Sequence, residues 1–144
     1  MTYMSTSALN IAIESLFATS WGSTTPVRYD NVPFVVPSSS WVALEVWDGL
    51  SGRASLGYPA LRRTQGVVYV SVYTQVGLGG KPARDLADAV VGVFRDIQVS
   101  GITFEEPDVK RIGEQSVSST GSVNSTTQWF QMVVAVPFFY DVVI

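Results

Sequence analysis

The sequence has neither cysteine nor histidine among its 144 residues. Without cysteine there is no disulfide and no thiolate nucleophile, and cysteine usage gives no sign of the redox compartment. The absence of histidine removes the commonest general base and the commonest protein ligand for metals. These two absences exclude the Ser–His–Asp and Cys–His catalytic arrangements, and we expect neither a metal nor another cofactor.

Charged side chains are also scarce, at 15% of the chain against about a quarter in a typical domain. The net charge of −3 provides no basic surface for binding nucleic acid. The N-terminus lacks the basic region and apolar run of a signal peptide. No apolar run approaches the roughly 20 residues that cross a bilayer. We therefore expect a soluble protein made in the cytoplasm, with no membrane partner.

What the chain does contain is a long strand, turn and helix unit over residues 66–97. Valines alternate with polar and aromatic residues over 66–76, which is the period of a strand. A glycine-rich turn follows, and Pro82 suits the first turn of a helix. The helix itself is predicted by an apolar stripe at helical spacing, formed by Leu86, Val90, Val93, Phe94 and Ile97.

Other segments complete an α+β domain. A stripe at Leu9, Ile13 and Phe17 predicts a first helix, and alternation predicts strands over 41–47 and 128–140. Shorter extended pieces are expected at 102–104 and 109–115. Glycine- and serine-rich composition predicts flexible loops near 48–65 and 113–127. At this length we expect one domain, residues 1–144, with a mixed, mainly antiparallel sheet and two helices packed on one face.

The second face of the predicted sheet carries large aromatic residues with a single charge, Glu45. Few charges and aromatics with polar tips are typical of the cores of protein interfaces. An equally weighted alternative is that these side chains cover one another, or pack beneath the proline-rich segment 25–40 or the long loop. The candidate interface residues are Trp41, Trp47, Tyr69, Tyr73 and Trp129.

Two patterns resemble catalytic motifs without meeting their requirements. The sequence Gly79-Gly80-Lys81 lies before a helix, but a phosphate-binding loop also needs a glycine where Gln75 stands and a hydroxyl where Pro82 stands. Residues 107–110 resemble a metal-dependent nuclease pattern, but such a site needs two separated acidic positions, and here all the parts fall within one tetrapeptide. A solvated acidic turn is the better interpretation. We expect no enzyme, and a small carboxylate-dependent enzyme remains the catalytic alternative.

The order of elements resembles the tail terminator proteins of long-tailed bacteriophages, the small gpU-like proteins. The resembling segments are the helix over 7–17, the strand over 41–47, the strand over 66–76 with its helix over 82–97, and the closing strand over 129–140. The resemblance covers nearly the whole chain and lies in architecture rather than in a catalytic signature.

The resemblance implies a virion structural protein at the head-proximal end of the tail, made in the host cytoplasm. Proteins of this kind form a ring, a homohexamer, that caps the tail tube, ends its polymerisation and provides a surface for head–tail joining. The implied partners are the tail tube protein and the head–tail connector protein, and DNA passes through the ring without specific binding. A head–tail connector or neck protein of the same virion is the alternative.

Two further groups of residues acquire expected roles in such a ring. Arg53, Arg62 and Arg63 in the first loop would pair with acidic groups on a partner, although plain solvation explains them equally well. The turn with Glu105, Glu106 and Asp108 would line the hole, where negative charge repels DNA phosphates.

Overall fold

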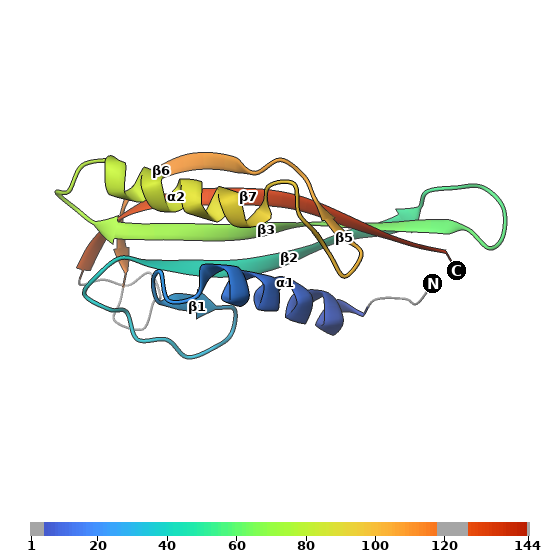
Figure 1. The fold of residues 1–144 in the computed structure, drawn as a ribbon, viewed down its shortest axis with the longest axis horizontal. Coiled ribbons are helices and arrows are strands. Elements are labelled where there is room, and N and C mark those ends of the chain that lie inside the picture. Colours follow the sequence, from blue (N-terminus) through green and yellow to red (C-terminus); the bar gives the residue numbers. More distant parts are fainter. Residues whose placement is uncertain (1–4, 118–126, 144) are drawn as a thin grey trace.

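The computed structural model describes residues 5–117 and 127–143 (Figure 1). Two helices and seven strands lie within these residues. In chain order they are α1 (Thr6–Trp21), β1 (Val27–Tyr29), β2 (Trp41–Arg53), β3 (Leu61–Gln75), α2 (Lys81–Phe94), β4 (Gln98–Val99), β5 (Ile102–Phe104), β6 (Asp108–Val117) and β7 (Thr127–Val143).

The strands form one sheet in the order β1-β2-β3-β7-β5-β4, and β6 also pairs with β7. Every pairing is antiparallel except that of β1 with β2, which is parallel. The sheet is therefore mixed and mainly antiparallel, as an α+β domain of this kind requires. Its long central strands β2, β3 and β7 run along the longest axis of the molecule (Figure 1).

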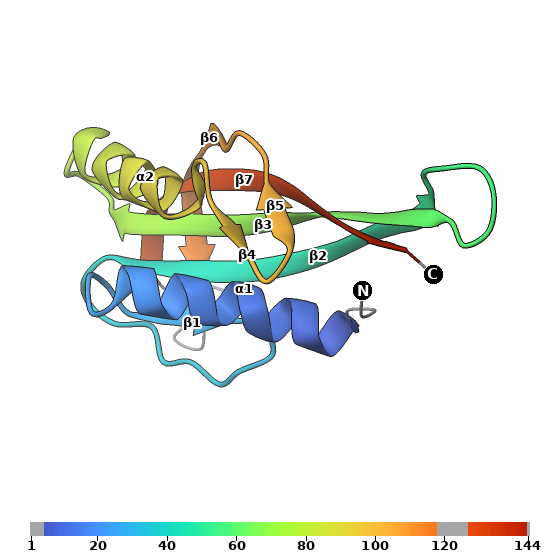
Figure 2. The same ribbon diagram turned by 45° about the vertical axis from the view of Figure 1, so that its right-hand side comes forward.

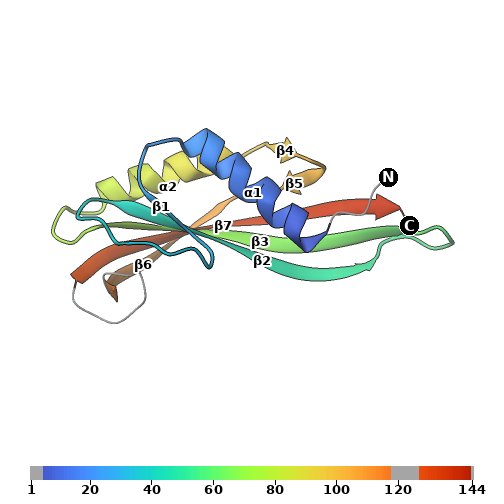
Figure 3. The same ribbon diagram turned by 90° about the horizontal axis from the view of Figure 1, so that it is seen from below.

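Both helices form at their predicted apolar stripes, but α2 ends at Phe94, so that Ile97 of the predicted stripe lies beyond it. Ser5 caps α1 by accepting a hydrogen bond from the backbone N–H of Ala8 at 3.1 Å, and Pro82 lies in the first turn of α2. The rings of Phe17 in α1 and Phe94 in α2 stack with centroids 6.0 Å apart. Both helices lie above the sheet in Figure 3.

One main core lies between these helices and the aliphatic residues of the sheet. Successive strand residues alternate between the two sheet faces, so the even-numbered residues over 42–46 of β2, 68–72 of β3 and 134–142 of β7 share the face that joins this core. The buried strand residues include Val42, Leu44, Val68, Val70, Val72, Val134, Val136 and Phe138. They complete a core with Leu9, Ile13, Phe17 and Trp21 of α1 and Ala87, Val90, Val91 and Phe94 of α2.

The segment expected to be a loop over 48–65 is largely strand. β2 continues to Arg53 and β3 begins at Leu61, so that only residues 54–60 connect them. Gly49 lies within a register shift between Asp48 and Ser51, whereas Gly52 is paired with Arg63. The end of β7 adds a third strand, because residues 140–143 pair with residues 61–64. Residues 51–64 and 140–143, here called the arm, project beyond the helices (Figures 1 and 2).

The second expected loop, over 113–127, is shortened at both ends. Residues 113–117 belong to β6, and β7 begins at residue 127. Residues 118–126 lie outside the described part of the chain.

Candidate assembly surfaces

The odd-numbered residues of the central strands lie on the sheet face opposite the main core. In the register of the sheet, Glu45 is opposite Tyr69, and Tyr69 is opposite Ala135. Most of the neighbouring side chains are neutral and partly exposed. We call this surface the outer face, and its residues are Glu45, Trp47, Val67, Tyr69, Ser71, Val133, Ala135 and Pro137.

The most exposed aromatic of the outer face is Trp47, at 59%. Its indole Nε1 donates a hydrogen bond to Oε1 of Glu45 at 3.0 Å. Its ring meets that of Tyr69 edge to face, with centroids 5.9 Å apart, a favourable geometry for aromatic pairs. Trp47 and Tyr69 thus form an oriented aromatic pair that reaches solvent in the subunit.

The other aromatics of this sheet face are covered by the subunit's own chain, so part of the predicted interface needs correction. Trp41 is fully buried and Trp129 is nearly so. Trp41 stacks on Tyr73, with centroids 4.1 Å apart, and packs against Phe34 from the proline-rich segment at 5.3 Å. Burial also raises the pKa of Tyr73. The alternative in which the proline-rich segment covers these rings therefore describes Trp41 and Trp129, which supply no accessible patch on the subunit.

The three arginines predicted to contact a partner have different surroundings. Arg63 forms a bidentate pair with Asp141, Nε to Oδ1 at 2.8 Å and Nη2 to Oδ2 at 2.9 Å, and its guanidinium lies 4.2 Å from the ring centroid of Phe139. These hydrogen bonds lower the pKa of Asp141. Arg53 donates to the backbone carbonyl of Gly57. Arg62 is exposed and makes no ion pair with another described residue.

Arg63 therefore joins β3 to β7 inside the subunit, and its acidic partner is Asp141 of the same chain. The two hydrogen bonds to Asp141 fix the orientation of its guanidinium. Of the three arginines, Arg62 is the one that the structure leaves available.

The three acidic residues at 105–108 do not act as one carboxylate cluster. Glu106 pairs with Arg95 at 2.6 Å, and Asp108 lies 3.9 Å from the amino group of Lys110. Glu105 is exposed, and its backbone N–H donates to the carbonyl of Pro137 at 2.8 Å. Across residues 5–117 and 127–143, no three acidic residues come together to hold a metal ion. No helix in the same residues is long and apolar enough to span a membrane.

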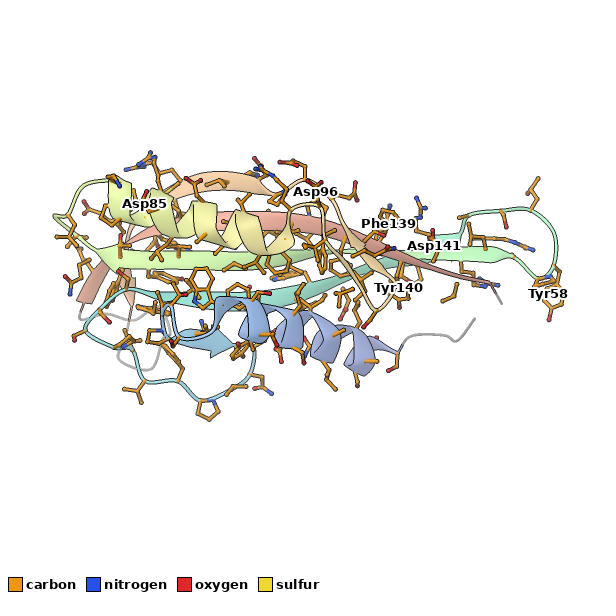
Figure 4. The ribbon with its side chains drawn as sticks, viewed as in Figure 1. Tyr58, Asp85, Asp96, Phe139, Tyr140 and Asp141 are labelled. Atoms are coloured by element: carbon orange, nitrogen blue, oxygen red, sulfur yellow. The ribbon has the colours of Figure 1, made fainter. Side chains whose placement is uncertain are left out.

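Sequence reasoning missed the tip of the arm. Leu56 is 97% exposed and Tyr58 is 91% exposed, and Tyr58 lies at the far end of the arm (Figure 4). The signal in the sequence was the presence of two large apolar residues, Leu56 and Tyr58, in a segment otherwise rich in glycine and arginine. Their significance depends on the arm being an ordered hairpin, which the loop-like composition concealed.

The fold and these surfaces define a small α+β protein with a neutral aromatic surface suited to assembly. The family model described as phage tail terminator protein matches residues 6–138. The chain belongs to this family, which places it among the structural proteins of the phage tail and implies interaction with other tail components.

Comparison of structures supports the fold independently. One of the solved structures that match has a TM-score of 0.59 and 19% sequence identity, and the match covers 99% of this chain and 98% of that one. At this identity the likeness concerns the fold alone. Among curated proteins, none matches the chain.

Proposed function

We propose that this protein forms a closed ring, a homohexamer, that caps the tail tube, ends its polymerisation and provides the surface for head joining. Membership of the tail terminator family supports the tail-capping role. The observation that carries the assembly role is the exposed Trp47–Tyr69 pair on the outer face, where Glu45 is already engaged by the Trp47 indole. Because the indole N–H of Trp47 is already hydrogen-bonded, a partner can cover this ring at low desolvation cost.

A closed ring needs two different patches on each subunit, because each copy contacts its neighbours head to tail. The outer face around Trp47 and Tyr69 is one such patch. The Glu105, Glu106 and Asp108 segment lines the hole in this proposal, so that its negative charge keeps DNA phosphates from binding during passage. The partners are the tail tube protein on one side of the ring and the head–tail connector protein on the other.

Deletion of the gene tests the role directly, with tail length measured by electron microscopy. A tail terminator predicts overlong tails, because nothing stops the growing tube. Tails of normal length detached from filled heads would contradict tube termination and indicate the connector role instead. Complementation with the wild-type gene should restore normal tails, which controls for effects on neighbouring genes.

A further inference from the structure

The arm is an ordered projection rather than a loose loop. Its hairpin is joined by a hydrogen bond between the hydroxyls of Ser51 and Thr64 at 2.7 Å and by one from Ala54 N–H to the carbonyl of Leu61 at 2.7 Å. The Arg63–Asp141 pair holds the hairpin to the last residues of β7. A preordered arm loses little conformational entropy when it docks.

The tip of this arm presents apolar anchors between cationic groups. Leu56 and Tyr58 are almost completely exposed. Two large apolar side chains exposed side by side at one tip are more informative than a single exposed leucine. Arg53 and Arg62 are register partners in the hairpin, on the two strands that lead to this tip. Tyrosine and arginine, which occur together here, are among the residues enriched in binding hot spots.

Charge in this chain is divided between the arm and the rest of the molecule. The arm has three arginines against one aspartate, a net charge of +2, and the remaining six cationic and eleven acidic residues give −5. Opposite charges on the two parts favour contact between the arm of one copy and the body of another.

A groove with the matching character lies between α1 and the segment after β1. Its cavity of about 280 Å³ is lined by Glu14, Ser15 and Ala18 from α1 and by Tyr29 and Val32. Within the described residues Glu14 makes no ion pair. Burial, and then the charge of Glu14, raise the pKa of Tyr29.

We propose that the arm tip of one copy docks into this groove of a second copy, with Leu56 and Tyr58 covering the apolar lining and Arg62 pairing with Glu14. The arm points away from its own α1 and β1 in all three ribbon views, so its partner is another molecule (Figures 1, 2 and 3). A neighbouring groove, around Pro33 and Val35, includes Arg28, whose charge repels the arm.

This contact is head to tail, since arm and groove are different surfaces of the same subunit, and it can therefore close a ring. It rests on the proposed function and specifies how neighbouring subunits hold one another. It also uses surfaces other than the outer face, so the two contacts can be tested separately.

The absence of native cysteine makes thiol cross-linking a clean test. A Leu56→Cys variant is mixed with Ala18→Cys or Val32→Cys, assembled alone or on tail tubes, and treated with a short bis-maleimide. Heterodimers between arm and groove variants are expected. The matched control is Leu78→Cys, an exposed leucine in the turn before α2, and it should give no more than background cross-linking with Leu56→Cys.

Charge reversal provides a second experiment, in which association is measured by sedimentation velocity. Arg62→Glu and Glu14→Arg should each weaken association about tenfold, because each places like charges together. An equimolar mixture of the two variants should recover wild-type association, since every arm then meets a groove of opposite charge. Asp88→Arg on α2, an exposed residue outside the groove, makes the same change in net charge as Glu14→Arg and should have little effect.

The outcomes separate this contact from the proposed function. A wild-type chain that forms no oligomer, either free or on tubes, would overturn both. An oligomer without arm-to-groove cross-links, or without rescue in the mixture, would overturn the docking and leave the ring. If Leu56→Ser with Tyr58→Ser leaves the oligomer intact but abolishes binding to tubes, the arm belongs to the tube contact and the docking is wrong.

Discussion

Trp41 and Trp47 show at the scale of single residues how one sequence pattern leads to two environments. They lie on the same strand, six residues apart, and on the same face of the sheet. Trp41 is enclosed by Phe34, Tyr73 and Trp129, while Trp47 remains mostly exposed. The proline-rich segment crosses one end of the sheet face and leaves the other end open.

This difference predicts opposite effects of the same substitution. Trp41→Ala should lower the free energy of unfolding of the subunit by about 3–5 kcal/mol, since it removes a fully buried aromatic and leaves a cavity. Trp47→Ala should cost the subunit less than about 1 kcal/mol but weaken self-association. Chemical denaturation measures the first effect and analytical ultracentrifugation the second. Equal loss of subunit stability in the two variants would contradict the assignment of Trp47 to an interface.

At the scale of secondary structure, the arm depends on three strands held together near their ends. The pair Arg63–Asp141 connects the two longest strands, β3 and β7, where the helices no longer cover the sheet. Phe139 packs beneath the guanidinium, and both Phe139 and Asp141 lie at the base of the arm (Figure 4). The order of the arm is therefore sensitive to the charge of one carboxylate.

The arm should become less ordered in acid. Because the pKa of Asp141 is lowered in the folded state, its contribution to stability is complete above the ordinary aspartate pKa of about 3.9. It is lost as the pH falls through the lowered folded value. The protection of the amides of residues 61–64, the intrinsic exchange rate at each pH relative to the observed rate, should fall over this range.

An Asp141→Asn variant provides the comparison for this pH effect. It should show faster exchange in the arm already at neutral pH and lose the acid-dependent change. Asp85→Asn, which breaks the exposed Lys81–Asp85 pair on α2, should leave exchange in the arm unchanged. An arm in Asp141→Asn with the pH profile of the wild type would show that the pair does not order it.

A second prediction for the strands concerns Gly66, where the chain passes close to its neighbours. A Cβ at this position would lie 2.6 Å from the carbonyl oxygen of Trp47 and 2.5 Å from the ring of Phe138. Gly66→Ala should therefore destabilise the subunit by about 1–3 kcal/mol through overpacking. Gly52→Ala, in the same sheet with open space around its Cβ, should be nearly neutral in thermal denaturation.

At the scale of the whole molecule, the proposed ring places the acidic segment, residues 105–108, at the hole and not at the contacts between subunits. Glu106 and Asp108 pair with cations of their own subunit. Replacing Glu105 and Glu106 by Gln and Asp108 by Asn should thus leave tail length and tail number near normal, as counted in electron micrographs. Loss of tails in this triple variant, with the subunit still folded, would show that the segment contacts a partner.

Much of the fold could be predicted from local patterns. The valine alternation over 66–76 predicted a strand that is longer in the structure, Leu61–Gln75. The helical stripe through Ile97 predicted a helix that ends earlier, at Phe94. The segment over 48–65 could not be predicted, because its glycines and arginines indicate a loop when taken alone. Residues 61–64 are strand because they pair with residues 51–53 on one side and with residues 140–143, nearly 80 positions away, on the other.

The candidate surfaces could also be predicted only in part from local patterns. Composition showed that aromatic residues with few charges lie on one sheet face, but burial of Trp41 and exposure of Trp47 depend on where the segment with Phe34 packs. The identity of Arg63 as a structural residue likewise depends on the register that brings Asp141 opposite it.

The sequence by itself determined the α+β class, the alternation of the strands, the two amphipathic helices and the absence of cysteine and histidine chemistry. These properties arise from periodicity and residue type, which are local. Only the tertiary structure decided that the arm is a three-stranded projection, which aromatics remain exposed and which charges are already paired. Those features depend on contacts between residues distant in the chain, and a local pattern contains no information about its distant partner.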